Sequence, residues 1–204
     1  MHMTLYKKMA HEIYELASSQ GGYFTTKQAQ EAGYAASTHS YNVNAGNWLR
    51  EHRGIYRLAN YPNPERPDLI LWSLWTCNRK GEPQGVYSHQ TALSIHDLSD
   101  LMPSKLHMTV PPGFRRNSSP AKALVLHKGI LNKSDAEDRH GFRVTRPLKT
   151  ILDIFAEGNV SQDHMQQAVL QAVQRGLFTL AEVERSARIP PELKKQIAKL
   201  AKGK

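Results

Sequence analysis

Small polar side chains crowd a short stretch around residue 40, and each can donate or accept hydrogen bonds. They are Ser37, Thr38, His39, Ser40, Asn42, Asn44 and Asn47. An asparagine amide can bond an adenine edge at two points, and serine or threonine hydroxyls can bond bases or phosphates. Arg53 and Arg57 follow, and arginines at these positions suit phosphates or the minor groove. The pattern predicts recognition of double-stranded DNA, and the alternative is a solvated face of a core helix.

The elements around this stretch are predicted to form a winged helix-turn-helix over residues 1–61. Apolar spacing predicts helices over residues 4–20, 27–32 and 37–49. In the third helix one apolar face is expected to hold Tyr41, Ala45, Trp48 and Leu49. A polar cluster ending in Gly54 and an alternating run over 55–58 predict a β-hairpin with Arg53 at its tip. In this arrangement the start of the third helix meets base edges in the major groove.

Residues 62–204 are predicted to form a second, α+β domain with a small sheet and a helical C-terminal half. Two prolines in the linker at residues 61–64 separate it from the first domain. Strands are expected over residues 106–110, 123–127 and 142–145, and helices over 68–76, from Ser88, 147–156, 162–175, 180–187 and from Pro190. Thr145, Ser161 and Thr179 are expected to cap three of these helices.

Composition narrows the class of protein. The chain has 204 residues, a formal net charge of +9 and one cysteine, Cys77, so disulfide scaffolds and cysteine-rich zinc sites are excluded. It has no apolar run of membrane-spanning length and no signal peptide at its start, which predicts a cytoplasmic protein.

The positive charge is spread along the chain. Residues 1–61 carry +2, residues 62–145 carry +3 and residues 146–204 carry +4. Five lysines between 194 and 204 form the densest patch of positive charge. This patch is either a solvated helix face near a helix C-terminus or a tail that contacts phosphates. Because the predicted DNA-reading domain has the smallest share, binding is expected to need two copies or help from the second domain.

Several residues invite a catalytic or metal-binding interpretation that the sequence does not favour. His89 and His96 are seven apart and share a helix face, but no His-Glu-x-x-His or cysteine pair accompanies them. Ser88 precedes His89, and we expect it to cap a helix rather than act as a nucleophile. No metal site, catalytic residue or cofactor is therefore predicted.

Acidic residues do not form a predicted Mg²⁺ site either. Three of them fall in an expected polar loop: Asp135, Glu137 and Asp138. Asp153 lies among apolar residues, and if it faces inward we expect Arg146 or Arg143 to pair with it. Since there is also no phosphate-binding glycine loop, the chain is expected not to be an enzyme.

Several segments resemble the AbiEi antitoxin family of abortive-infection systems. They are residues 24–29, Trp48-Leu49 with the wing at 53–58, the Ser-His-x-x-Ala-Leu segment within 87–98, residues 105–111 and residues 144–153. The resemblance covers roughly residues 5–180. It implies an N-terminal winged helix and a C-terminal antitoxin domain. It also implies a DNA-binding autorepressor of a type IV toxin–antitoxin operon.

The resemblance implies two partners. One is an inverted-repeat operator bound by a possible homodimer, and the other is a nucleotidyltransferase-like toxin that need not form a stable complex with this chain. Three alternatives stay open: a nuclease-like DNA-processing enzyme with a winged-helix targeting domain, a solitary transcriptional regulator, and a protein-interaction module that has lost DNA binding.

Overall fold

The computed structural model describes residues 2–116 and 122–202, which fold as a mixture of helices and small sheets. Contacts divide the chain into two compact units. The N-terminal unit is Met1–Gly85 with Asp138–Arg143, and the C-terminal unit is Val86–Glu137 with Val144–Lys204. The boundary between the compact units therefore differs from the one predicted at residue 61. Residues 62–85 and the later segment Asp138–Arg143 group with the N-terminal unit.

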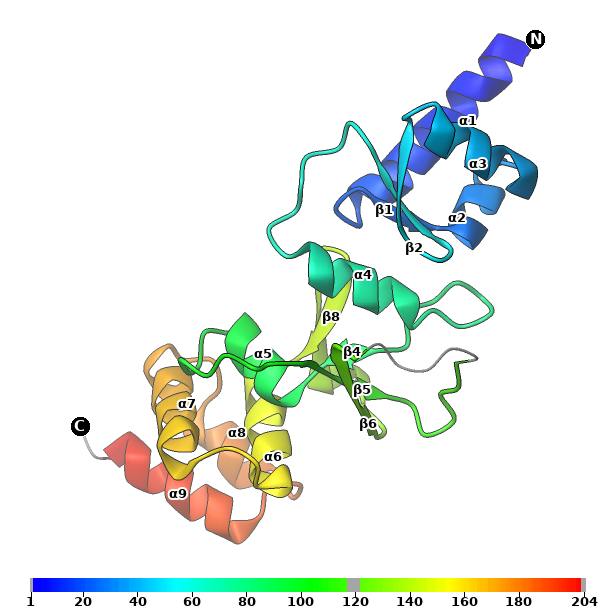
Figure 1. The fold of residues 1–204 in the computed structure, drawn as a ribbon. Coiled ribbons are helices and arrows are strands. Elements are labelled where there is room, and N and C mark those ends of the chain that lie inside the picture. Colours follow the sequence, from blue (N-terminus) through cyan, green and yellow to red (C-terminus); the bar gives the residue numbers. More distant parts are fainter. Residues whose placement is uncertain (1, 117–121, 203–204) are drawn as a thin grey trace. The chain divides into compact units, whose positions relative to one another are not determined.

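The N-terminal unit surrounds a three-stranded antiparallel sheet with the order β1-β3-β2 (Figure 1). Its elements are α1 (His2–Ser18), β1 (Tyr23–Thr25), α2 (Thr26–Glu31), the 3-10 helix η1 (Ala36–Thr38), α3 (His39–Asn44), β2 (Trp48–His52), β3 (Ile55–Leu58) and α4 (Pro67–Trp75). The elements follow one another in the order that the sequence predicts.

Local chemistry explains where α2 begins and how the unit packs. Thr25 and Gln28 form a capping box, in which the Thr25 hydroxyl accepts from the Gln28 N–H and the Gln28 carboxamide accepts from the Thr25 N–H. The Phe24 and Trp48 rings meet edge to face at 4.9 Å in the core. The apolar stripe of α1 is buried at Ile13 and Ala17 but does not extend to Leu5, which is 58% exposed.

The C-terminal unit contains most of a five-stranded sheet with the order β6-β5-β4-β8-β7. Its elements are β4 (Val86–Tyr87), α5 (His89–Ile95), β5 (Leu106–Val110), β6 (Leu124–Lys128), η2 (Lys133–Asp135), β7 (Ala136–Arg139), β8 (Phe142–Thr145), α6 (Pro147–Glu157), α7 (Gln162–Gln174), α8 (Leu180–Arg185) and α9 (Pro191–Lys202). β4 runs antiparallel to β5 and parallel to β8, and β5 runs parallel to β6. The far ends of β7 and β8 belong to the N-terminal unit.

Helices α5 to α9 share one apolar core, and their caps largely follow the prediction. Ser161 caps α7, and Thr179 forms a capping box at α8. Thr145 is not the cap, because α6 begins at Pro147, as predicted, and the N-cap position is therefore Arg146. The Thr145 hydroxyl instead bonds the Thr150 hydroxyl at 2.7 Å.

The predictions for two acidic residues are wrong, one in its surroundings and the other in its partner. Asp135 lies in η2 rather than a solvated loop, and Arg188 binds it through two N–H···O bonds of 2.7 and 3.0 Å. Asp153 pairs with Lys149, one turn earlier on α6, and not with Arg146 or Arg143. Spacing along a helix brings i and i+4 together, which explains the second case.

Near α5 the structure changes the predicted role of Ser88 and agrees with the predicted role of His96. Ser88 occupies the N-cap position, but its side chain makes no capping bond, because Thr109 Oγ1 and His89 Nδ1 engage its hydroxyl at 2.8 and 2.9 Å. His96 is buried with its Nε2 atom 2.8 Å from the Thr145 carbonyl oxygen, which is the structural role expected for it.

No helix among the described residues is both long enough and apolar enough to cross a membrane.

Candidate nucleic-acid interface

Helix α3 is shorter than predicted and points a different face outward. It ends at Asn44, and Gly46 follows with a φ of +76°, a left-handed conformation that ends helices. Trp48 is therefore the first residue of β2 rather than part of the helix. The predicted apolar face included Ala45, Trp48 and Leu49, which lie beyond the end of α3, and Tyr41, which was expected in the core with them, is 70% exposed.

The exposed side of η1, α3 and the turn after it is rich in small polar groups. The predicted DNA-binding residues exposed there are Ser37, Thr38, Ser40, Asn44 and Asn47. Two of them already have structural partners, because the Thr38 hydroxyl donates to the Ala35 carbonyl at 2.7 Å and the Asn47 amide donates to Asn42 Oδ1 at 3.2 Å. The side chains of Ser37, Ser40 and Asn44 make no hydrogen bond to another described residue and lie on one helical surface, which suits contact with an external partner.

Two predicted contact residues, His39 and Asn42, face inward instead. The His39 ring packs against Trp48 with centroids 5.4 Å apart. The Asn42 amide donates to the Thr38 carbonyl at 2.9 Å, and its oxygen accepts from the Asn47 amide at 3.2 Å. Because both side chains are buried, they shape the helix and cannot reach a groove edge directly.

Of the two predicted arginines on the hairpin of β2 and β3, one is exposed and the other is paired within the hairpin. Arg53 lies exposed in the turn between the strands, as predicted. The Arg57 Nε atom donates to Glu51 Oε1 at 2.8 Å, and only 13% of the Arg57 side chain is exposed. Arg57 is therefore neutralised within the hairpin and is a poor phosphate ligand.

Sequence reasoning missed two exposed residues beside this surface. Tyr41 lies on α3 and Arg50 lies on β2. The glycine at position 46 was the available signal, since a helix that stops there cannot include Trp48 and Leu49, the residues that placed Tyr41 on the predicted apolar face. Tyrosine offers both a ring and a hydroxyl to a partner, and Arg50 adds a second cation on the hairpin.

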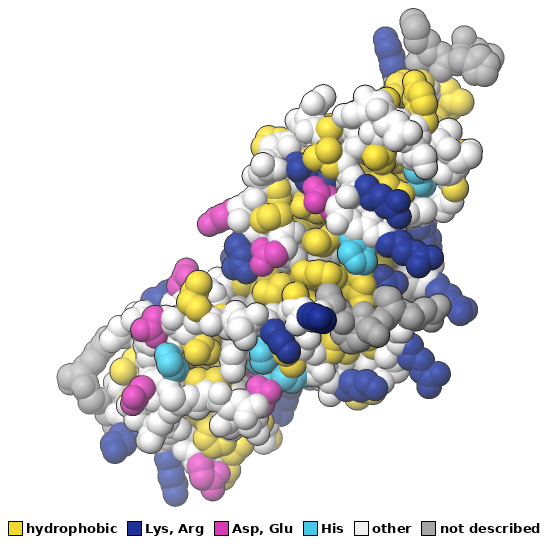
Figure 2. Space-filling view, in the orientation of Figure 1, with side chains coloured by type: hydrophobic (Ala, Val, Ile, Leu, Met, Phe, Trp, Pro, Cys, Tyr) yellow, Lys and Arg dark blue, Asp and Glu magenta, His cyan; other side chains and the backbone are white. Residues whose placement is uncertain are grey.

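The N-terminal unit has only a small positive net charge. By formal charge the N-terminal unit carries +3 and the C-terminal unit carries +6. On the face drawn in Figure 2, Lys and Arg side chains are spread out, and acidic side chains lie among them. The charge favours contact with a polyanion without defining a single basic patch.

The N-terminal segment is similar to a known family. Residues 11–59 match a family model described as "Transcriptional regulator, AbiEi antitoxin". The match confirms the predicted resemblance over the last part of α1, the polar surface of α3 and the hairpin.

Curated protein sequences and solved structures give two further results. No curated protein sequence matches the chain. Among solved structures, one described as "Crystal structure of RV2827C protein from Mycobacterium tuberculosis" is 12% identical, with a TM-score of 0.46, and the similarity covers 95% of this chain and 80% of that chain.

Proposed function

We propose that residues 1–61 form a winged helix-turn-helix that binds operator DNA, and that the chain is a transcriptional repressor of the AbiEi antitoxin type. The observation that carries the proposal is the AbiEi match over residues 11–59. It coincides with the elements that a winged helix needs: helices α2 and α3 followed by the β2–β3 hairpin.

In this proposal α3 is the recognition helix and the hairpin is the wing. Ser37, Ser40 and Asn44 face bases in the major groove, with Thr38 and Asn47 at the margins of the contact. Asn44 is the residue best suited to discriminate a base, because an amide can bond adenine at two points. Arg53 contacts the phosphate backbone from the turn of the wing.

Two copies on an inverted repeat would supply the affinity that one copy lacks. Affinity for DNA depends on how many phosphates the protein neutralises, and the N-terminal unit has a small excess of cations. A dimer doubles the number of phosphate contacts without any change in the charge of each copy. We therefore expect the operator to contain two half-sites related by a two-fold axis.

The second part of the proposal is that the chain counteracts a nucleotidyltransferase-like toxin encoded beside it, in an operon that the chain represses. Its support is the antitoxin family to which residues 11–59 are similar. Co-expression of the full chain with that neighbouring protein tests it. Restored growth supports antitoxin activity, and growth arrest that the chain fails to relieve would leave a solitary regulator.

Fluorescence anisotropy tests DNA binding with a labelled duplex from upstream of the chain's own reading frame. The expected result is binding that exceeds that of a scrambled duplex and weakens steeply as salt rises, with a slope of about −0.9 per phosphate contact in a double-logarithmic plot. Equal affinity for the two duplexes, or no dependence on salt, would refute sequence-specific binding.

Matched variants test the interface itself. Asn44→Ala should weaken binding to the operator about 5- to 150-fold, because one bidentate base contact is worth about 1–3 kcal/mol. Asn63→Ala removes an exposed asparagine outside α3 and should leave binding unchanged.

A second pair of variants separates the wing from general charge. Arg53→Ala should reduce affinity for the operator and the scrambled duplex alike and lower the salt slope by about 1. Lys195→Ala removes one exposed positive charge from α9 and should not change the slope. If both variants change it equally, net charge rather than the wing determines the phosphate contacts.

A further inference from the structure

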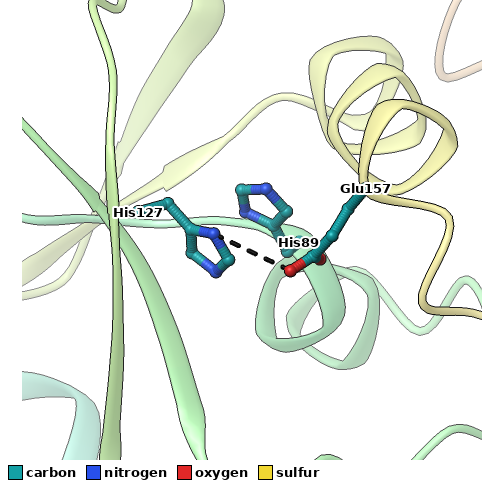
Figure 3. A group of neighbouring side chains, drawn as sticks. All are labelled: His89, His127 and Glu157. Atoms are coloured by element: carbon teal, nitrogen blue, oxygen red, sulfur yellow. Dashed lines mark ion pairs between the residues drawn. The ribbon is translucent and has the colours of Figure 1, made fainter.

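A polar cluster lies inside the C-terminal unit at the junction of its sheet and helices. His89 is the first residue of α5, His107 lies on β5, His127 lies on β6 and Glu157 ends α6. Thr109 is the register partner of His127, and residues two apart on a strand share a face, so the His107 and His127 side chains project toward the same side of the sheet. Figure 3 shows that His89, His127 and Glu157 converge from three separate elements.

The three side chains in Figure 3 have the composition and spacing of a metal site. One ligand atom from each of His89, His127 and Glu157 lies within 4.8 Å of the others. Two imidazoles and one carboxylate form a ligand set that zinc accepts, with a fourth position left for water. The approach is open on one side, because the His127 and Glu157 side chains are each 20% exposed.

Hydrogen bonds leave one nitrogen of each histidine available. His89 Nδ1 lies 2.9 Å from Ser88 Oγ, so its Nε2 atom is the one left for a ligand. His127 Nε2 lies 3.0 Å from His107 Nδ1, which leaves His127 Nδ1 on the side of Glu157. Metal-bound histidines usually make such a bond through the other ring nitrogen, which fixes the tautomer and the ring orientation.

The local charge balance favours a cation beside Glu157. Lys149 is paired with Asp153 and so does not neutralise the glutamate. The charged partner of Glu157 is His127, whose Nδ1 atom lies 3.9 Å from Glu157 Oε1. Glu157 Oε2 is buried and has no hydrogen-bond partner among the described residues. A buried carboxylate oxygen without a partner is costly, and a bound cation would offset that cost.

The backbone of His89 also suits a ligand. His89 has a φ of +51°, a left-handed conformation that histidine rarely adopts. Residues held in such conformations cluster at ligand sites, where the surrounding structure enforces them.

The present ring arrangement must change to bind a metal. The His89 and His127 rings are stacked, with centroids 3.6 Å apart and planes 14° from parallel. Lone pairs of imidazole lie in the ring plane, so stacked rings direct them side by side rather than to one point. Rotation of a ring about its Cβ–Cγ bond, which has a broad torsional preference, would make them converge, and the bond of that ring to Ser88 or His107 would adjust with it.

We propose that His89, His127 and Glu157 bind a divalent transition-metal ion of the zinc class, through His89 Nε2, His127 Nδ1 and a carboxylate oxygen of Glu157. Ser88 and His107 orient the two imidazoles. The site goes beyond the proposed DNA-binding function, because all of its residues belong to the C-terminal unit and none lies on the α3 surface.

Metal titration of the full chain tests the proposal. The protein is stripped with a chelator, and Zn²⁺ is added in competition with a chromophoric chelator, while Co²⁺ is added in parallel to record its visible absorption. We expect one equivalent of Zn²⁺ per chain and a Co²⁺ spectrum of tetrahedral type. Absence of stoichiometric binding would overturn the proposal.

Variants decide whether these residues hold the ion. Glu157→Gln keeps the shape of the side chain and should weaken Zn²⁺ binding by at least about tenfold, as should His127→Gln. His164→Gln is the matched control, because His164 also lies beside a carboxylate, with its Nε2 atom 3.5 Å from Asp100 Oδ1, and belongs to the same unit. Equal losses in His164→Gln and Glu157→Gln, or wild-type affinity in a folded Glu157→Gln, would overturn the site.

Imidazole NMR of the wild-type chain gives a readout that needs no variant. The nitrogen resonances of His89 and His127 should shift on addition of one equivalent of Zn²⁺, and the ring-current shifts of the stacked pair should disappear. Unchanged resonances of both residues would contradict the proposal even if the histidine variants fail to fold.

Discussion

The ion pair between Asp135 and Arg188 joins two segments 53 residues apart in the C-terminal unit, and its loss should be measurable. The carboxylate is nearly buried, with 8% of the side chain exposed, whereas 48% of the guanidinium side chain is exposed. Arg188→Ala removes the exposed partner and leaves the buried one. The variant therefore tests how much an uncompensated buried carboxylate costs.

The structure sets the size of the expected effect. Removing one partner of a fully buried pair costs about 3–5 kcal/mol. Here water can approach through the space that Arg188 leaves, and the Asn132 N–H continues to bond Asp135 Oδ2 at 2.8 Å. We therefore expect Arg188→Ala to lower the free energy of unfolding by about 2–3 kcal/mol at neutral pH.

The effect should depend on pH in a defined direction. Burial alone would raise the pKa of Asp135, but hydrogen bonds from Arg188 and from the Asn132 N–H hold it below its ordinary value. A carboxyl whose folded pKa is lowered stabilises the fold above its unfolded pKa, and this stabilisation is lost as the pH falls through the folded value. The difference between wild type and Arg188→Ala should accordingly shrink as the pH falls from about 5 to about 3.

Urea denaturation followed by far-UV circular dichroism, together with hydrogen exchange of residues 132–139 and 186–193, measures this effect. Trp48, Trp72 and Trp75 all lie in the N-terminal unit, so tryptophan fluorescence reports the other unit separately. Arg185→Ala is the control, since Arg185 is exposed at the end of α8 and should change stability by less than about 0.5 kcal/mol. Equal effects of the two variants, or a loss that does not vary with pH, would refute the reasoning.

Two further predictions concern the N-terminal unit, and urea denaturation followed by tryptophan fluorescence checks both. Gly22→Ala and Gly46→Ala both place a side chain at positive φ, which should lower the free energy of unfolding by about 1–2 kcal/mol. Only at Gly22 would the new Cβ also lie 2.6 Å from the Tyr61 ring. Gly22→Ala should therefore destabilise the unit more than Gly46→Ala, by at least about 1 kcal/mol. Equal losses would show that the ring moves freely. Asn42→Ala should destabilise the unit by about 1–2 kcal/mol, because Asn42 is buried and hydrogen-bonded. Asn44→Ala should change stability by less than about 0.5 kcal/mol, because Asn44 is exposed. A larger loss in Asn44→Ala than in Asn42→Ala would contradict the orientation of α3.

The order of the elements could be predicted from the sequence because it depends on local signals. Glycine stops, proline starts and hydroxyl caps locate most helix boundaries within a few residues, as at Ser161 and Thr179. The hairpin tip at Arg53 follows equally from the adjacent glycine. These signals act over three or four residues, and tertiary contacts agree with them here.

The orientation of side chains was harder to predict. In α3 the predicted apolar face depended on Ala45, Trp48 and Leu49, which lie beyond the end of the helix at Asn44, so that Tyr41 was expected inside and Asn42 outside. The histidine cluster was missed because His127 and Glu157 come from elements far from His89 in the chain. Parallel pairing of β5 with β6 places His127 opposite Thr109, and no local pattern specifies that pairing.

The hairpin of β7 and β8 has a consequence for synthesis of the chain on the ribosome. Its tip, Asp138–Arg143, belongs to the N-terminal unit, and a Cβ on Gly141 would lie only 3.1 Å from Ile70. The first 85 residues emerge early but lack this piece until more than fifty further residues have been translated. A nascent chain therefore exposes the surface around Ile70 during that interval. The polar surface of α3 is made entirely from residues that emerge before this tip, so the proposed DNA-binding segment can form while the rest of the protein is still being made.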